Sequence, residues 1–167
     1  LVCYGLMKFG TDEQKRHLLG PLARGEILGA YCLTEPNAGS NAANQETAAV
    51  EAGDAFVLNG TKQWITNGGE AAIYTVIALT DPARGVRGSS AILVEKGHPG
   101  FEFGKKENKM GIRASATREL IFQDCFVPEE GRLGAEGQGL KIALEALDES
   151  RVTVGAEAVG ISRAAYE

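Results

Sequence analysis

The stretch Ala55–Thr66, AFVLNGTKQWIT, decides how most of the chain is interpreted. Residues that favour β-strands stand on both sides of Asn59 and Gly60. Both central residues tolerate the positive φ that a two-residue type I′ turn requires. The stretch therefore predicts a β-hairpin, and the Asn and Gly residues at positions 67–69 predict where its second strand ends.

The second strand of this hairpin has a readable pattern of faces. Since strand side chains alternate, Lys62, Trp64 and Thr66 are predicted on one face and Gln63 and Ile65 on the other. An indole and a hydroxyl about 7 Å apart match the span of a flat fused ring. Trp64 and Thr66 are therefore either a stacking platform for a planar cofactor or a core Trp beside an ordinary strand Thr.

The region around this hairpin is rich in short β-prone runs separated by turn residues, as in an antiparallel sandwich or barrel. The predicted strands are Ile27–Thr34, Ala55–Asn59, Lys62–Thr66, Ala72–Thr80, Ser90–Glu95 and Arg118–Val127.

Helical patterns flank the β-rich region. Thr11 and Gln14 form a capping-box pattern that opens a short helix, which we expect to be interrupted near Gly20 and Pro21 and to stop at Gly25. After the GAEGQG segment, apolar residues recur at helical spacing, and the Ala-rich end of the chain contains no stop signal. The order of elements predicts an α+β protein.

Composition excludes several classes of function. The chain has 167 residues and a formal net charge of −5 without any Lys or Arg run, so we expect no nucleic-acid or anionic-membrane binding. Its longest apolar run, Ala71–Leu79, is too short to span a bilayer, and its first residues do not resemble a signal peptide. The three cysteines are widely spaced and the two histidines stand alone. We therefore expect no disulfide framework, no metal site and a reducing, cytoplasmic or matrix-like compartment.

The stretch Tyr31–Asn41, YCLTEPNAGSN, combines a strand with a loop of turn residues. Thr34 is the last predicted strand residue, because Pro36 forces a turn. Asn37 and Gly39 tolerate left-handed backbone, which would let successive amides converge on an anion. The alternative is an ordinary polar loop without a ligand.

Charged residues give two further candidates. Asp148 and Arg151 lie three apart on the predicted C-terminal helix, and are either a polar clamp for a substrate with amides and phosphates or a solvated ion pair. Arg87 and Arg113 stand beside glycines in loops and could meet phosphate, although solvated surface charge is the more common role.

Four stretches, YCLTEPNAGS, WITNGG, MGIRASATRELIF and LDESR, in this order and at these separations, resemble the acyl-CoA dehydrogenase family. The resemblance covers essentially the whole chain. It implies an antiparallel β-barrel or sandwich as the middle domain, flanked by parts of two helical domains. We expect residues 1–28 to end the first helical domain, residues 29–134 to form the middle domain, and residues 135–167 to begin the second helical domain.

The resemblance also implies the cofactor FAD, an acyl-CoA substrate and an electron-transfer flavoprotein as partner. By this likeness Thr34 hydrogen-bonds the isoalloxazine ring, Thr66 points to its N5 atom, and Trp64 and Ile65 pack on it. Ser40 lies beside the acyl-CoA and the cofactor's pyrophosphate, and both Asp148 and Arg151 contact the substrate. The residues assigned to FAD in this way are Tyr31, Cys32, Leu33, Thr34, Gly39, Ser40, Trp64, Ile65 and Thr66. Asn37 and Asn41 depart from the Gly and Asp of many members.

The reaction implied is α,β-dehydrogenation to a trans-2-enoyl-CoA, on short- to medium-chain substrates, as in fatty-acid β-oxidation. Some members carry the base just before the Arg of the last motif, where this chain has Ser150, and Glu149 is rotated about 100° away on the helix. We therefore expect the catalytic carboxylate beyond Glu167, an inactive isolated fragment, and a tetramer or dimer at full length. Two alternatives stay open: an acyl-CoA oxidase-like flavoenzyme and a β-barrel that binds a small molecule without chemistry.

Overall fold

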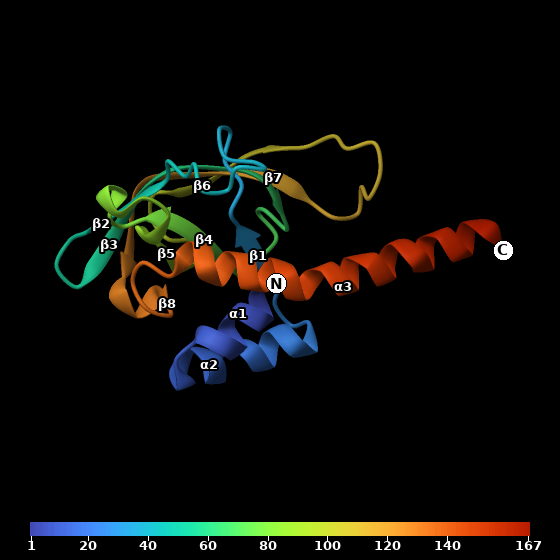
Figure 1. Ribbon diagram of the computed structural model, residues 1–167, viewed down its shortest axis with the longest axis horizontal. Helices are drawn as coiled ribbons and strands as arrows, with labels where there is room; N and C mark the ends of the chain where they lie inside the picture. Colours follow the sequence, from blue (N-terminus) through green and yellow to red (C-terminus); the bar gives the residue numbers. More distant parts are fainter.

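The computed structural model describes residues 1–167, and Figure 1 shows one curved sheet with the helices gathered on one side of it. The helices are α1 (Val2–Phe9), α2 (Asp12–Arg24) and α3 (Gly139–Tyr166), with two short 3-10 turns, η1 (Pro82–Arg87) and η2 (Glu129–Gly131). The strands are β1 (Gly29–Cys32), β2 (Ala48–Glu51), β3 (Ala55–Thr66), β4 (Ile73–Leu79), β5 (Ser89–Glu95), β6 (Phe101–Lys106), β7 (Thr117–Pro128) and β8 (Arg132–Leu133).

The start and end of α2 follow the sequence signals. The Thr11 hydroxyl accepts from the Gln14 amide and the Gln14 side chain accepts from the Thr11 amide, which confirms the capping box. Gly25 ends the helix with φ 71. The interruption expected at Pro21 is wrong, because α2 runs through it. A proline deletes only one amide donor, and here it stands in the second half of a 13-residue helix.

The sheet has the order β6-β7-β3-β2-β4-β5-β8, with β1 beside β4 off this path. Most neighbours are antiparallel, but β1 and β2 each pair with β4 in parallel. The α+β class and the middle β-region between helices are confirmed. The sheet is mixed and open, since its path does not close into a barrel.

The hairpin predicted at Asn59 and Gly60 is wrong. One strand, β3, runs through both residues and pairs with β7 along its length, with a register shift between Leu58 and Gly60. Gly60 has φ 147, and a Cβ atom there would lie 2.7 Å from the Cα of Thr47. The glycine therefore serves a β-bulge and a close backbone approach instead of a turn.

The remaining strand predictions vary in quality. The runs predicted around β1, β4, β5 and β7 match those strands to within a few residues. Strands β2, β6 and β8 were not predicted. β2 and β6 contain Ala, Gly, Glu and Lys, which disfavour strands, so these segments are extended because neighbouring strands offer backbone partners.

The curved sheet encloses one core and packs its other side against the helices. The enclosed core contains a cluster of aromatic rings, in which Phe101 and Phe122 stack with centroids 4.8 Å apart and Tyr74 meets Phe101 edge-on. A second core includes Leu6 of α1 and Ile142 of α3. This second core fixes α1 and the first half of α3 against β4 and β5.

The second half of α3 leaves the sheet. Every residue from Arg151 to Glu167 is exposed, and Figure 1 shows this part of the helix extending away from the other elements. The predicted C-terminal helix is confirmed. None of the three helices combines the length and apolar character that crossing a membrane demands.

Candidate functional site

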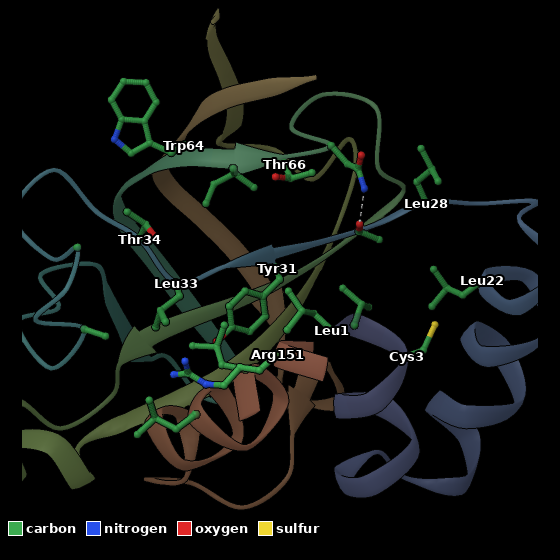
Figure 2. Close-up of a pocket in the computed structure, with 18 of the residues that line it drawn as sticks. Leu1, Cys3, Leu22, Leu28, Tyr31, Leu33, Thr34, Trp64, Thr66 and Arg151 are labelled. Atoms are coloured by element: carbon green, nitrogen blue, oxygen red, sulfur yellow. Dashed lines mark hydrogen bonds between the residues drawn. The ribbon is translucent and has the colours of Figure 1, made fainter. Parts of the chain in front are cut away.

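A cavity of about 780 Å³ lies where the end of β3, strand β1 and the loop after it meet the three helices (Figure 2). Its volume is within the usual range for small-molecule and cofactor sites. Eight of the nine residues that the sequence assigned to a cofactor line it: Tyr31, Leu33, Thr34, Gly39, Ser40, Trp64, Ile65 and Thr66. The structure thus brings two separate sequence motifs to one place.

Strand β1 and the residue that follows it, Leu33, present alternate residues to the cavity. Tyr31 and Leu33 line it, while Cys32 is fully buried in the core inside the curved sheet. The ninth assigned residue therefore contributes no side chain to the cavity. Burial also raises the pKa of the Cys32 thiol, which keeps it protonated.

Trp64 reaches the cavity through an irregular backbone. The ladder between β3 and β7 shifts register between Lys62 and Ile65, and Trp64 has φ 59. A bulky residue rarely adopts this left-handed conformation. The indole is 56% exposed, which excludes the alternative of a core Trp.

The predicted faces of this strand are only partly right. Trp64 and Thr66 are both exposed and line the cavity, as predicted. Lys62, expected beside them, is fully buried. The bulge adds one residue between Lys62 and Ile65, so the alternation changes face at that point.

Two hydroxyls stand beside the indole. Figure 2 shows Thr34, Trp64 and Thr66 on one side of the cavity, opposite Arg151. The side chains of Thr34 and Thr66 have no hydrogen-bond partner in the chain, so both hydroxyls are available to a ligand. An aromatic face flanked by two free hydroxyls suits a planar, polar-edged ring.

The loop after β1 is tighter than expected. Glu35 and Ala38 exchange two backbone hydrogen bonds, and the Asn37 side chain donates to the Glu46 carboxylate at 3.3 Å. Neither Asn37 nor Gly39 has a positive φ, so the left-handed anion nest, one of the two possibilities left open for this loop, is wrong. The amides of Gly39 and Ser40 make no hydrogen bond within the chain and remain free donors at the cavity.

The two candidate residues of α3 differ in position. Arg151 lines the cavity, whereas Asp148 does not. Their side chains form an ion pair at 3.3 Å and are each about three-quarters exposed. Two loop arginines, Arg87 and Arg113, were also candidates for phosphate binding. Arg113 donates to Asn108 within its own loop, and neither arginine lines the cavity.

The Tyr31 hydroxyl, in a residue that was assigned to the cofactor, is buried without a hydrogen-bond partner. Two further lining residues, Asn67 and Leu22, were not predicted. Asn67 lines the cavity with φ 64 and donates to the Gly29 carbonyl at 3.0 Å, the bond dashed in Figure 2. Leu22 of α2 completes the wall. Only the last of these lacks any sequence signal, because helix packing alone places it there.

The structure contains no cluster of three or more His, Cys, Asp or Glu residues that could hold a metal ion. All three cysteines are free.

The model of the acyl-CoA dehydrogenase middle domain matches residues 30–125. The chain belongs to the acyl-CoA dehydrogenase family. It is 49% identical to the short-chain-specific acyl-CoA dehydrogenase of Clostridium acetobutylicum, over 99% of this chain and 44% of that relative. It is 46% identical to the short-chain-specific mitochondrial enzyme of Rattus norvegicus, over 97% of this chain and 39% of the relative.

Solved structures of the family superpose closely. Butyryl-CoA dehydrogenase from Megasphaera elsdenii gives a TM-score of 0.95 at 51% identity, over 98% of this chain and 43% of that chain. A chain in the structure of the electron-transferring flavoprotein of Acidaminococcus fermentans gives a TM-score of 0.94 at 53% identity, over 96% of this chain and 42% of that chain. Glutaryl-CoA dehydrogenase from Mycobacterium smegmatis, solved with FADH2, gives a TM-score of 0.82 at 39% identity, over 90% of this chain and 38% of that chain. The chain spans less than half the length of these relatives.

Proposed function

We propose that the full-length protein is an FAD-dependent acyl-CoA dehydrogenase for short- to medium-chain substrates. It removes one hydrogen from each of the α and β carbons of an acyl-CoA and releases a trans-2-enoyl-CoA. An electron-transfer flavoprotein then takes up the electrons. The short-chain-specific and butyryl-CoA relatives support the substrate class, and the Acidaminococcus fermentans structure supports the partner.

The cavity fits a flavin on observations of this chain alone. Trp64 is exposed at a strained φ, which a fold without a ligand has no reason to maintain. The hydroxyl of Tyr31 is buried without a partner. Thr34 and Thr66 present free hydroxyls beside the indole (Figure 2). This convergence on one cavity is the single observation that carries the proposal.

We assign the roles as follows. Trp64 and Ile65 would pack against the isoalloxazine ring, Thr34 would hydrogen-bond its edge, and the Thr66 hydroxyl would be available to its N5 atom. Bound FAD would supply the acceptor for the hydride that leaves the β carbon. A hydrogen bond donated by Thr66 would favour negative charge on the ring.

The substrate side of the site is assigned to the loop and to α3. Ser40 lies beside the acyl-CoA and the pyrophosphate of FAD, where its free amide adds a donor. Arg151 faces the same cavity, and Asp148 orients its guanidinium through their ion pair.

The catalytic base is proposed outside residues 1–167. The Ser150 hydroxyl donates to the Leu147 carbonyl at 2.8 Å, and a hydroxyl cannot serve as the base in place of a carboxylate. Glu149 does not line the cavity. Removal of a weakly acidic α-proton needs a carboxylate held close to that carbon, and no candidate in this chain meets that need.

The same proposal covers the organisation of the full-length protein. We assign residues 1–28 to the end of an N-terminal helical domain, residues 29–134 to the middle domain and residues 135–167 to the start of a C-terminal helical domain. The full-length protein is proposed to be a tetramer or dimer. Bacterial and mitochondrial relatives support a bacterial cytoplasm or a mitochondrial matrix as its location.

The deciding experiment mixes the purified full-length protein with butyryl-CoA without oxygen and follows the flavin absorbance. Bleaching of the flavin, reversed by an electron-transfer flavoprotein, supports the proposal, whereas a colourless protein contradicts it. Rapid reoxidation by oxygen with peroxide release would instead indicate an oxidase. The isolated residues 1–167 should bind flavin poorly and give no bleaching.

A further inference from the structure

Lys62 is a buried cation that the proposed mechanism does not use. Its side chain is fully buried, and its ammonium nitrogen lies within hydrogen-bond distance of three acceptors. It donates to the Leu33 carbonyl at 3.2 Å, to Glu35 Oε1 at 2.6 Å and to Gln45 Oε1 at 2.5 Å. An ammonium group has three hydrogens, so every donor of Lys62 has a partner.

These partners extend along the whole loop that joins β1 to β2. The Glu35 carboxylate accepts from the backbone amides of Glu46 at 2.6 Å and Thr47 at 3.1 Å. The Gln45 side chain donates to the Ala42 carbonyl at 3.0 Å. The cluster of Lys62, Glu35 and Gln45 therefore fixes the loop at its beginning, its middle and its end.

The same cluster adjoins both halves of the cavity. The loop that it fixes carries Thr34 and Ser40, which line the cavity. One residue after Lys62, the Gln63 amide donates to the Thr34 carbonyl at 2.8 Å. The next residue is Trp64, at the bulge. None of the three cluster side chains lines the cavity itself.

We propose that Lys62, Glu35 and Gln45 are positioning residues, which hold the Thr34–Ser40 side of the cavity in register with the Trp64 side. This inference rests on the proposed flavin site. It assigns to these residues an effect on flavin affinity that acts only through the loop and the bulge.

Stability alone does not account for such a cluster. Replacing a buried ion pair with apolar residues of similar volume is often neutral or stabilising, whereas removing one partner is costly. An apolar core, however, has no acceptor for the amides of Glu46 and Thr47. The charged residues are therefore needed for the path of the loop, while the core could be filled without them.

The test compares four full-length proteins: wild type, Lys62→Met, the double variant Lys62→Met/Glu35→Leu, and Val94→Ala. Val94 is fully buried in the same core, on β5, so its truncation is a control for lost packing. Three quantities are measured: the thermal midpoint, the dissociation constant for FAD, and hydrogen exchange of residues 34–47 in flavin-free protein.

Lys62→Met should lower the thermal midpoint, since it leaves a buried carboxylate unpaired. The double variant should regain part of that loss, because it removes the unpaired carboxylate but leaves the amides of Glu46 and Thr47 without an acceptor. It should bind FAD at least about tenfold more weakly than wild type, as expected for a misplaced binding loop. Its residues 34–47 should exchange faster. Val94→Ala should lower the midpoint and leave flavin affinity and loop exchange unchanged.

A double variant with wild-type FAD affinity and wild-type loop protection would overturn the inference. If it does not fold, Gln45→Leu decides, because it keeps the ion pair: faster loop exchange with weaker FAD binding supports the inference, and no change in either overturns it. Absence of FAD binding by the wild type would refute the proposed function, and the exchange data on flavin-free protein would still decide on the loop.

Discussion

Lys62 and Ile65 lie three residues apart in β3, and both side chains are buried. In an unbroken strand this odd spacing would place them on opposite faces. The register shift between them takes up one residue, and Trp64 is turned outward with φ 59. The aromatic wall of the cavity therefore depends on a backbone irregularity, which can be tested by substitution.

Trp64→Gly should be more stable than Trp64→Ala. Both changes delete the indole, but glycine relieves the left-handed φ that costs other residues about 1–2 kcal/mol. In a regular strand the order is reversed, with glycine about 0.5–1 kcal/mol worse than alanine. Urea unfolding of the two variants measures the difference, and an alanine variant more stable than the glycine variant would contradict a strained Trp64.

Gly60→Ala should destabilise the protein strongly. The new methyl group would lie 2.7 Å from the Cα and the hydroxyl of Thr47, at a φ of 147. We expect a loss of more than about 2 kcal/mol, from strain and overpacking together. Gly111→Ala is the control, because a Cβ there has nothing within 4 Å and its φ is not positive. Equal unfolding midpoints for both variants would refute the close approach at Gly60.

The contribution of the Glu35 carboxylate to the stability of the folded protein should disappear in acid. Burial acts to raise the pKa of Glu35, but Lys62 and the amides of Thr47 and Glu46 outweigh it and hold the pKa below its usual value. Since the folded pKa is lower than the unfolded one, the stability gained is complete above the unfolded pKa of about 4.3 and is lost as pH falls through the folded value. At pH 7 we expect Glu35→Gln to cost about 3–5 kcal/mol.

The difference in the free energy of unfolding between wild type and Glu35→Gln should therefore shrink as the pH falls from 5 to 3. Denaturant unfolding at each pH measures it. Glu13→Gln, which alters an exposed carboxylate on α2, is the matched control and should cost little at any pH. A Glu35 effect that stays constant down to pH 3 would mean that Glu35 has the same pKa in the folded and the unfolded protein, so that Lys62 does not lower it.

The cysteines should differ in reactivity. Cys3 is exposed, whereas Cys32 and Cys125 are buried. Burial raises the pKa of the Cys125 thiol to about 11 and that of Cys32 beyond its ordinary range. At pH 8 both buried thiols should react with iodoacetamide on the order of 100-fold more slowly than Cys3, because the thiolate is the nucleophile. Peptide mass spectrometry measures the rates, and rapid labelling of Cys32 in native protein would contradict its position.

The motifs predicted which residues lie close together better than they predicted the strands of the sheet. Thr34, Trp64 and Thr66 were assigned from motifs, and the structure places all three around one cavity. The hairpin failed because an Asn-Gly pair at a turn and a Gly at a bulge look alike in sequence. Only the approach of Thr47, a long-range contact, distinguishes them.

The same reason explains why Lys62 was misplaced. Strict alternation of side chains assumes a regular ladder of strand pairs, and nothing in the local sequence indicates a bulge at Trp64. A lysine is seldom fully buried, so the residue type also favoured a solvent-exposed position for Lys62. Its burial follows from Glu35 and Gln45, which are far from it in the sequence. Strands β2 and β6 were missed for a related reason, since their pairing partners determine them more than their residues do.

The parallel pairing of β1 with β4 joins Gly29 to Ile73. A chain leaving the ribosome from its N-terminus therefore exposes β1 as an unpaired edge until synthesis has passed β4. Closing so long a segment is slow compared with forming a local hairpin. We expect the cavity lined by Thr34 and Trp64 to be among the last parts of the molecule to form.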